Sequence, residues 1–152
     1  MTSEPYGFLG ERQANLDTAD ALRRVPLLRD LGDDHVMAIA RHAHEERLGA
    51  GQVMVTEGDA STGLVLLLEG SAAVQKDGRR LRRLEPGEFF GEMALIDGEP
   101  RSATVIADTP VHIVTLESRV FNSLLDSDPD LWRKLLIVLC DRLRSQSSSP
   151  VD

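Results

Sequence analysis

The sequence predicts a mainly β (α+β) fold, a jelly-roll-like antiparallel β-roll flanked by N- and C-terminal helices. Short β-prone runs separated by turn signals fill residues 50–117, and the segments on either side carry apolar residues at helical spacing. The chain has 152 residues, 41% hydrophobic and 28% charged, which suits a single globular domain with its own core.

Residues 17–48 are predicted to be helical. One helix begins at Asp17 or Thr18 and is broken near Pro26. The segment DDHVMAIARHAHEERL follows and repeats apolar residues at the spacing of a second helix, which is expected to reach residue 48.

Residues 50–117 are predicted to form the β-roll, with strands in QVMVT, GLVLLLEG, SAAVQ, RLRRL, SATVIA and VHIVTL. Asp77 and Gly78 predict a tight hairpin, because both residue types tolerate the positive φ of a type I′ turn. The adjoining run KDGRRLRR is interpreted as a solvated basic face balanced by nearby acids. An acidic partner or a membrane surface is the alternative.

Residues 117–146 are predicted to form two more helices. The last begins with Asp128 as N-cap and Pro129 in the first helical position, where the missing N–H costs nothing. Its apolar residues occupy more than one face, so it needs cover on several sides, and the roll can cover only one. Trp132 and Cys140 are expected to be packed within this cover. The rest could contact the N-terminal helices, a second copy of the chain or an effector.

The two chain ends, residues 1–16 and 148–152, are predicted to be flexible. The N-terminus has no apolar stretch of signal-peptide length, and one cysteine cannot form an internal disulfide, so a cytoplasmic location is expected. The sequence leaves open whether the chain is a stand-alone module or part of a longer protein.

The composition and motifs also disfavour several classes of function. The net charge of −8 disfavours direct DNA binding, which depends on neutralising phosphates. The longest apolar run, LLIVLC, is too short to span a membrane. No metal-binding cluster or nucleophile motif accompanies the carboxylates of Glu88 and Glu92, so an enzyme is not expected.

The stretch around residues 91–102 predicts a site for a small anion. Gly91 permits close backbone approach, and the N–H groups at the start of the following helical turn can face an anion. Arg101 can grip two phosphate oxygens, and Ser102 adds a hydroxyl. Glu92 has the wrong charge for phosphate but suits a sugar hydroxyl. This combination indicates a monoanionic sugar phosphate, although a surface turn could contain the same residues.

The stretch FGEMALIDGEPRSATV resembles the phosphate-binding cassette of the cyclic nucleotide-binding domain family. That family includes the bacterial catabolite activator protein and the regulatory subunits of cAMP-dependent protein kinase. The match extends to glycines of the predicted roll and covers residues 25–146. The resemblance implies an eight-stranded β-roll flanked by helices.

The resemblance also implies residue roles. Arg101 would pair with the cyclic phosphate, Ser102 would hydrogen-bond it, and Glu92 would accept the ribose 2′-OH. The phosphate would also be lined by the backbone of Gly91, Met93 and Ala94. The pocket wall would be apolar, formed by Val74, Leu81 and Leu84. The base would be contacted from the last helix by Arg142, Gln146 and Ser147.

We therefore expect a non-enzymatic sensor that binds a cyclic nucleotide and converts occupancy into movement of its terminal helices. Ser102 resembles the residue of cAMP-preferring members, so cAMP is the first candidate and cGMP the second, with no metal. The alternative is a degenerate fold of the same family that acts as an interaction or dimerisation module without ligand. A homodimer through the last helix or an effector protein is the expected partner.

Overall fold

The computed structural model describes residues 17–147, with a short helical segment at 17–23 before the first named element. The helices that follow are η1 (Pro26–Leu28), α2 (Asp33–His42), α3 (Glu92–Asp97), α4 (Ser118–Ser127) and α5 (Pro129–Ser147). The strands are β1 (Ala43–Leu48), β2 (Val53–Val55), β3 (Gly63–Glu69), β4 (Ala72–Lys76), β5 (Arg79–Leu84), β6 (Phe89–Phe90), β7 (Thr104–Ala107) and β8 (Val111–Glu117). The expected flexible ends lie outside the described residues.

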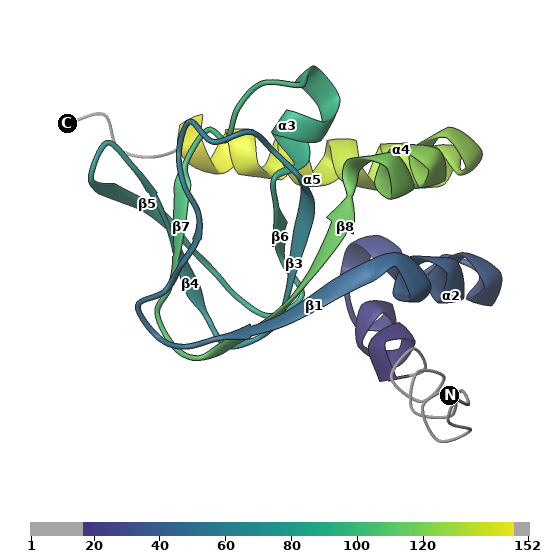
Figure 1. The fold of residues 1–152 in the computed structure, drawn as a ribbon. Helices are drawn as coiled ribbons and strands as arrows, with labels where there is room; N and C mark the ends of the chain where they lie inside the picture. The colour runs from purple at the N-terminus through teal and green to yellow at the C-terminus, as the bar shows by residue number, and fades with distance from the viewer. Residues whose placement is uncertain (1–16, 148–152) are drawn as a thin grey trace, which may run out of the picture.

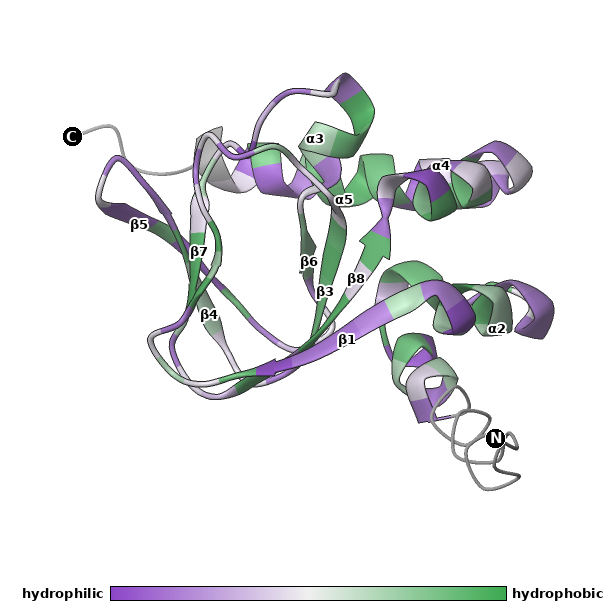
Figure 2. Ribbon diagram, in the orientation of Figure 1, coloured by the Kyte–Doolittle hydropathy of each residue, from purple (hydrophilic) through white to green (hydrophobic). Residues whose placement is uncertain are grey.

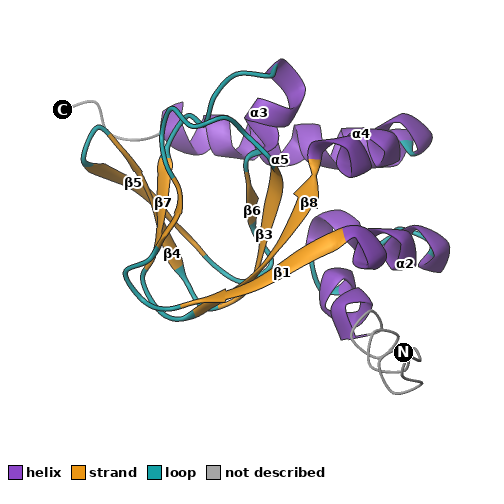
Figure 3. Ribbon diagram, viewed as in Figure 1, coloured by secondary structure: helices purple, strands orange, loops and turns teal. Residues whose placement is uncertain are grey.

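The eight described strands form two four-stranded antiparallel sheets that face each other as a roll (Figures 1 and 3). One sheet has the order β1-β8-β3-β6 and the other the order β2-β7-β4-β5. The helices gather on one side of the roll, beside the first of these sheets. The predicted class, an antiparallel β-roll flanked by helices, is therefore confirmed.

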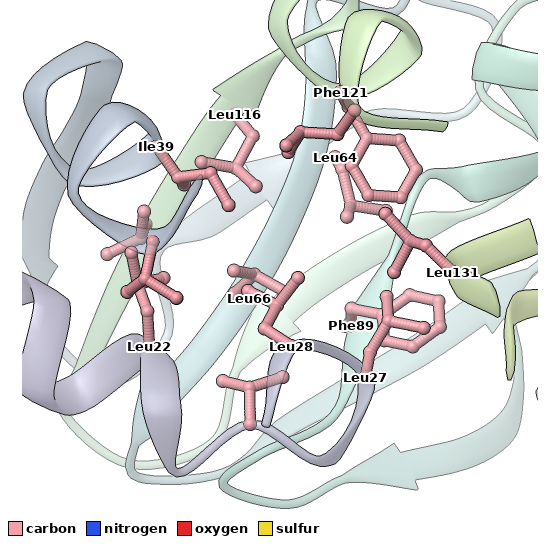
Figure 4. Close-up of a cluster of buried hydrophobic side chains, with 14 of the residues drawn as sticks. Leu22, Leu27, Leu28, Ile39, Leu64, Leu66, Phe89, Leu116, Phe121 and Leu131 are labelled. Atoms are coloured by element: carbon pink, nitrogen blue, oxygen red, sulfur yellow. The ribbon is translucent and has the colours of Figure 1, made fainter. Parts of the chain in front are cut away.

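Strand β3 is buried on both faces and separates two apolar clusters. Leu64 and Leu66 join the cluster shared with the helices, whereas Val65 and Leu67 face the interior of the roll. Figure 4 shows the helix-side cluster, in which side chains from the N-terminal helices, β3, β8, α4 and α5 meet. Because successive side chains of β3 point to opposite faces, this one strand packs against the helices on one side and fills the roll on the other.

The prediction that helices run to residue 48 was wrong for the last six residues. Residues 43–48 form β1, which pairs in continuous register with β8 from Ala43↔Leu116 to Leu48↔Val111. AHEERL has good helix formers, but backbone pairing along β8 overrides that weak local preference. The strand is an edge with charged, exposed side chains, and it is hydrophilic in Figure 2.

The turn chemistry was predicted correctly. Asp77 and Gly78 have φ of 52° and 77°, and they join β4 to β5 as a hairpin. Asp128 caps α5 as expected, with its Oδ1 accepting the Asp130 N–H at 3.1 Å. Among the described helices, none is long and apolar enough to cross a bilayer.

Helix α5 is covered on one side only. Leu131 and Leu135 are fully buried against the helix-side cluster, and Trp132 packs at its border. The opposite side exposes a short apolar stripe, formed by Leu136, Ile137, Cys140 and Leu143. The expectation that Cys140 is buried was wrong, because it lies one turn from Leu136 on this exposed face.

Candidate functional site

The predicted anion-binding stretch begins where β6 ends. Gly91 has φ of 93° and lies between β6 and the first residue of α3. Gly98 has φ of 72°, and its N–H donates to the Ala94 carbonyl at 2.9 Å, which closes the helix. The helical turn and its glycine stop were thus predicted, and the turn starts two residues earlier than Ala94.

Gly91 allows the guanidinium of Arg101 to lie directly against the backbone. A Cβ built on Gly91 would stand 2.2 Å from Nη1 of Arg101 and 3.0 Å from the carbonyl oxygen of Gly63. No other residue type leaves that space, and the positive φ independently favours glycine. Gly91 and Arg101, ten positions apart in sequence, therefore form one compact unit.

Arg101 is a buried cation with unused hydrogen-bonding capacity. The residue is 6% exposed, and within the described part of the chain its Nη1 has no hydrogen-bond partner. Its backbone is fixed on both sides, donating to Asp59 O at 2.8 Å and accepting from Gly58 N at 2.9 Å. Burial lowers the pKa of the guanidinium, an effect that the nearby Glu92 carboxylate opposes. Such an arrangement favours an incoming anion.

Glu92 is buried at the start of α3 and is 5% exposed. Its carboxylate accepts a hydrogen bond from Nη1 of Arg142, which reaches across from α5. Arg142 also donates to the carbonyl oxygen of Phe89, and its guanidinium lies 4.7 Å from the centroid of that ring. The last helix is therefore attached to the predicted sugar-binding carboxylate.

The remaining predicted residues divide into three groups. Ala94 lies buried at the start of α3, whereas Met93 is 53% exposed and Ser102 is also exposed. Val74 and Leu84 face the interior of the roll. Their contacts with a ligand stay predictions.

Leu81 is 54% exposed, so it is not part of the buried wall in this structure. It falls at a register shift between β4 and β5, where Val74 pairs with Arg82 and Gln75 with Arg80. Leu81 is three positions before Leu84, and residues an odd number of positions apart on a strand face opposite sides, which is why their burial differs. Gln146 and Ser147 end α5, and their side chains lie outside what the structure describes.

Arg82 was not among the predicted site residues, because the run KDGRRLRR that contains it was interpreted as a solvated face. Arg82 is directly opposite Val74, and directly opposed residues of antiparallel strands share a face, so its side chain turns toward the roll interior. Counting back by two from the apolar Leu84 would have placed Arg82 on the inner face.

Comparison of this chain with known protein families, sequences and solved structures agrees with the geometry of the site. A family model described as the cyclic nucleotide-binding domain matches residues 45–128, more than half of the chain. The chain belongs to the cyclic nucleotide-binding domain family. The matched region contains both sheets except the start of β1, and it contains all of α3 and Arg101.

Relatives of this domain occur in several protein classes. A cyclic nucleotide-gated potassium channel of Mesorhizobium japonicum is 40% identical over 107 residues, which is 70% of this chain and 30% of the channel. A cAMP-dependent protein kinase regulatory subunit of Hypocrea atroviridis is 34% identical over 113 residues, 74% of this chain and 24% of the subunit. The chain thus matches only about a quarter to a third of these relatives' length.

Solved structures share the fold. The regulatory domain of Toxoplasma gondii protein kinase A with cAMP aligns with a TM-score of 0.72 and 27% identity, over 82% of this chain and 50% of that one. The regulatory subunit of a cAMP-independent protein kinase A from Trypanosoma brucei aligns with a TM-score of 0.73 and 21% identity, over 83% and 48%. The same fold therefore occurs in proteins described as cAMP-bound and as cAMP-independent.

Proposed function

We propose that this domain is a sensor that binds a 3′,5′-cyclic nucleotide and transmits occupancy through its C-terminal helix. The single observation that carries the proposal is the buried Arg101, whose Nη1 lacks a partner and lies against Gly91. A singly charged phosphate would neutralise this cation and use its donor. Glu92, buried close by, would accept the ribose 2′-OH.

cAMP is the first ligand to test, because the Toxoplasma gondii neighbour is bound to it and Ser102 resembles the residue of cAMP-preferring members. The proposed location is the cytoplasm, where such ligands are signals. The proposed partner is an effector or a second copy of the chain, which would cover the exposed stripe of α5.

The contacts of Arg142 support a route for this coupling. Nη1 of this α5 side chain donates to the Glu92 carboxylate that would also accept the ribose 2′-OH, so the ligand would share that carboxylate with the helix. A ligand shifts an equilibrium only through a difference in its interactions with the two states. Such a difference would arise if a ribose hydroxyl on Glu92 replaced the contact of Arg142 with that carboxylate, because the contact would then exist only in the ligand-free state.

Thermal denaturation with cAMP, cGMP, 5′-AMP and buffer tests the proposal. A ligand that binds only the native state, present at 100 times its Kd, adds about 2.7 kcal/mol to the unfolding free energy. We expect cyclic nucleotides to raise the melting temperature and 5′-AMP to do so far less. No shift with either cyclic nucleotide at millimolar concentration would favour the alternative of a ligand-free interaction module.

A further inference from the structure

The turn that follows β2 lies against the segment that carries Arg101. Asp59 closes this turn by donating its N–H to the Thr56 carbonyl at 3.1 Å. Within the described chain, both backbone hydrogen bonds of Arg101 go to the turn. Its N–H donates to Asp59 O at 2.8 Å, and its carbonyl accepts from the Gly58 N–H at 2.9 Å. The position of the Arg101 backbone therefore depends on the position of the turn.

The segment around Arg101 has little backbone support of its own. Residues 98–103 lie between α3 and β7 and form neither helix nor strand. The start of the segment is held by the end of α3, through the Glu99 N–H, which donates to Oδ1 of Asp97 at 2.9 Å. From there to the first residue of β7, the bonds to the turn are the contacts that fix the backbone on either side of the Arg101 side chain.

Thr104, the first residue of β7, anchors the same turn through its hydroxyl. The N–H of Glu57 donates to Oγ1 of Thr104 at 2.9 Å in half-buried surroundings. Strand β2 ends at Val55, whose partner in β7 is Val105, so this bond continues the connection beyond the last pair of the ladder. A threonine hydroxyl can accept such a bond, whereas a valine of the same shape cannot.

These contacts connect Thr104 to the proposed phosphate site through the backbone. The hydroxyl holds Glu57, and the next two residues of the turn hold Arg101. A site that is fixed in its binding geometry loses less conformational entropy when the ligand arrives. A site whose competent geometry is populated only part of the time binds more weakly by that fraction. Release of the turn should therefore lower the affinity for a phosphate at Arg101.

We infer that Thr104 is a positioning residue of the nucleotide site, whose hydroxyl fixes the turn after β2 and through it the backbone of Arg101. The inference rests on the proposed function, because it concerns the affinity for a nucleotide held by Arg101. The effect acts on the phosphate end of the ligand, so it is independent of the base and equal for cAMP and cGMP.

Thr109 provides a matched control beyond the other end of β7. Its Oγ1 accepts the Ser71 N–H at 2.9 Å, again in half-buried surroundings, and its hydroxyl donates to the Pro110 carbonyl at 3.1 Å. Thr109→Val thus removes the same kind of bond as Thr104→Val, together with one more. The length of β7 separates the two threonines, so the control lowers stability without releasing the turn at Arg101.

Calorimetric titration of wild type, Thr104→Val, Thr104→Ser and Thr109→Val with cAMP and cGMP tests the inference. Thr104→Val should weaken both nucleotides by about 5-fold, which is what one ordinary hydrogen bond is worth. Thr104→Ser keeps the hydroxyl and should restore most of the affinity. Thr109→Val should leave both Kd values within about 2-fold while lowering the melting temperature at least as much as Thr104→Val.

Hydrogen exchange of the free chains, followed by NMR, adds a measurement that needs no ligand. The Arg101 N–H donates to Asp59 O, so it should exchange faster in Thr104→Val than in wild type and at the wild-type rate in Thr109→Val once the rates are compared well below both melting temperatures. A faster exchange that appears in Thr104→Val alone would show that the hydroxyl acts on Arg101 rather than on overall stability.

Three results would overturn the inference: wild-type affinity in Thr104→Val, equal losses of affinity in Thr104→Val and Thr109→Val, or an unchanged exchange rate of the Arg101 N–H. Should Thr104→Val lower the melting temperature to the titration temperature, Thr104→Ala provides the same test. A wild type that binds neither nucleotide refutes the proposed function and, with it, this inference. A wild type that binds both without an effect of Thr104 refutes the inference alone.

Discussion

Arg142 of α5 donates to the carboxylate of Glu92, which lies 50 residues earlier in the chain, at the start of α3. Both side chains are largely buried, with 17% and 7% of their surface exposed. The pair is a direct contact between the last helix and the residue expected to hold the ribose. Because the same carboxylate is proposed to accept the ribose hydroxyl, we expect occupancy of the site and the position of α5 to be coupled.

The first prediction is that cyclic nucleotide loosens or shifts α5. A ribose hydroxyl on Glu92 should weaken the contact of Arg142 with the same carboxylate, so backbone protection in residues 128–146 should change. Hydrogen exchange with and without saturating cAMP measures this. In Arg142→Ala the ligand-induced change should be reduced. Unchanged protection in wild type would mean that α5 is a fixed structural element, held by contacts such as Lys134 Nζ to Asp30 Oδ2 at 2.6 Å.

The second prediction concerns Arg101. Removing one partner of a buried charge pair costs about 2–5 kcal/mol, so Arg101→Ala should weaken cyclic nucleotide binding by roughly 30- to 5,000-fold. Arg101→Lys should restore only part of the affinity, because a point charge cannot make a two-pronged contact with phosphate. Calorimetry gives both values. Wild-type affinity in Arg101→Ala would require another phosphate site.

The third prediction separates backbone strain at Gly91 from its role beside Arg101. Gly91→Ala and Gly98→Ala both place alanine at a positive φ, which costs roughly 1–2 kcal/mol of stability. Only at Gly91 does the added Cβ meet the Arg101 guanidinium, since no atom lies within 4 Å of it at Gly98. Melting temperatures should therefore fall in both variants, whereas nucleotide affinity should fall only in Gly91→Ala. A comparable loss of affinity in both would show that the glycines act through stability alone.

The fourth prediction is discrimination against 5′-AMP. The described site offers Arg101 for the phosphate, while the neighbouring Glu92 repels additional negative charge. A 5′-monophosphate carries nearly a second charge and lacks the fixed ring geometry. Competition between 5′-AMP and bound cAMP should require a large excess of 5′-AMP. Equal affinity of the two would contradict a cyclic-nucleotide site.

The fifth prediction is that the exposed stripe of α5 takes part in association. Leu136 and Leu143 are 53% and 63% exposed, so the described part of the chain leaves one side of the helix uncovered. A symmetric pair would present the same stripe from both copies. Sedimentation should show a dimer that Leu136→Glu dissociates, while Arg41→Glu, at an exposed position of α2 rather than on this stripe, serves as a charge control. A wild type that stays monomeric at high concentration would leave an effector as the partner of this face.

Sequence by itself determined the roll, most of its strands, the Asp77-Gly78 hairpin, the capped start of α5 and the cassette. These features rest on local rules: alternation, turn residues that accept positive φ, and caps that act within a few positions. The family resemblance pointed to Gly91, Glu92 and Arg101 as parts of one site, and the structure brings them together through β6, α3 and the turn before β7.

Only the tertiary structure decided the rest. Residues 43–48 became a strand because β8 offers a partner for their backbone, which no local preference reveals. Arg142 met Glu92 because α5 packs back across β6, a contact between segments that β7, β8 and α4 separate in the chain. Long-range pairing depends on where distant segments settle, and local sequence rules do not contain that information.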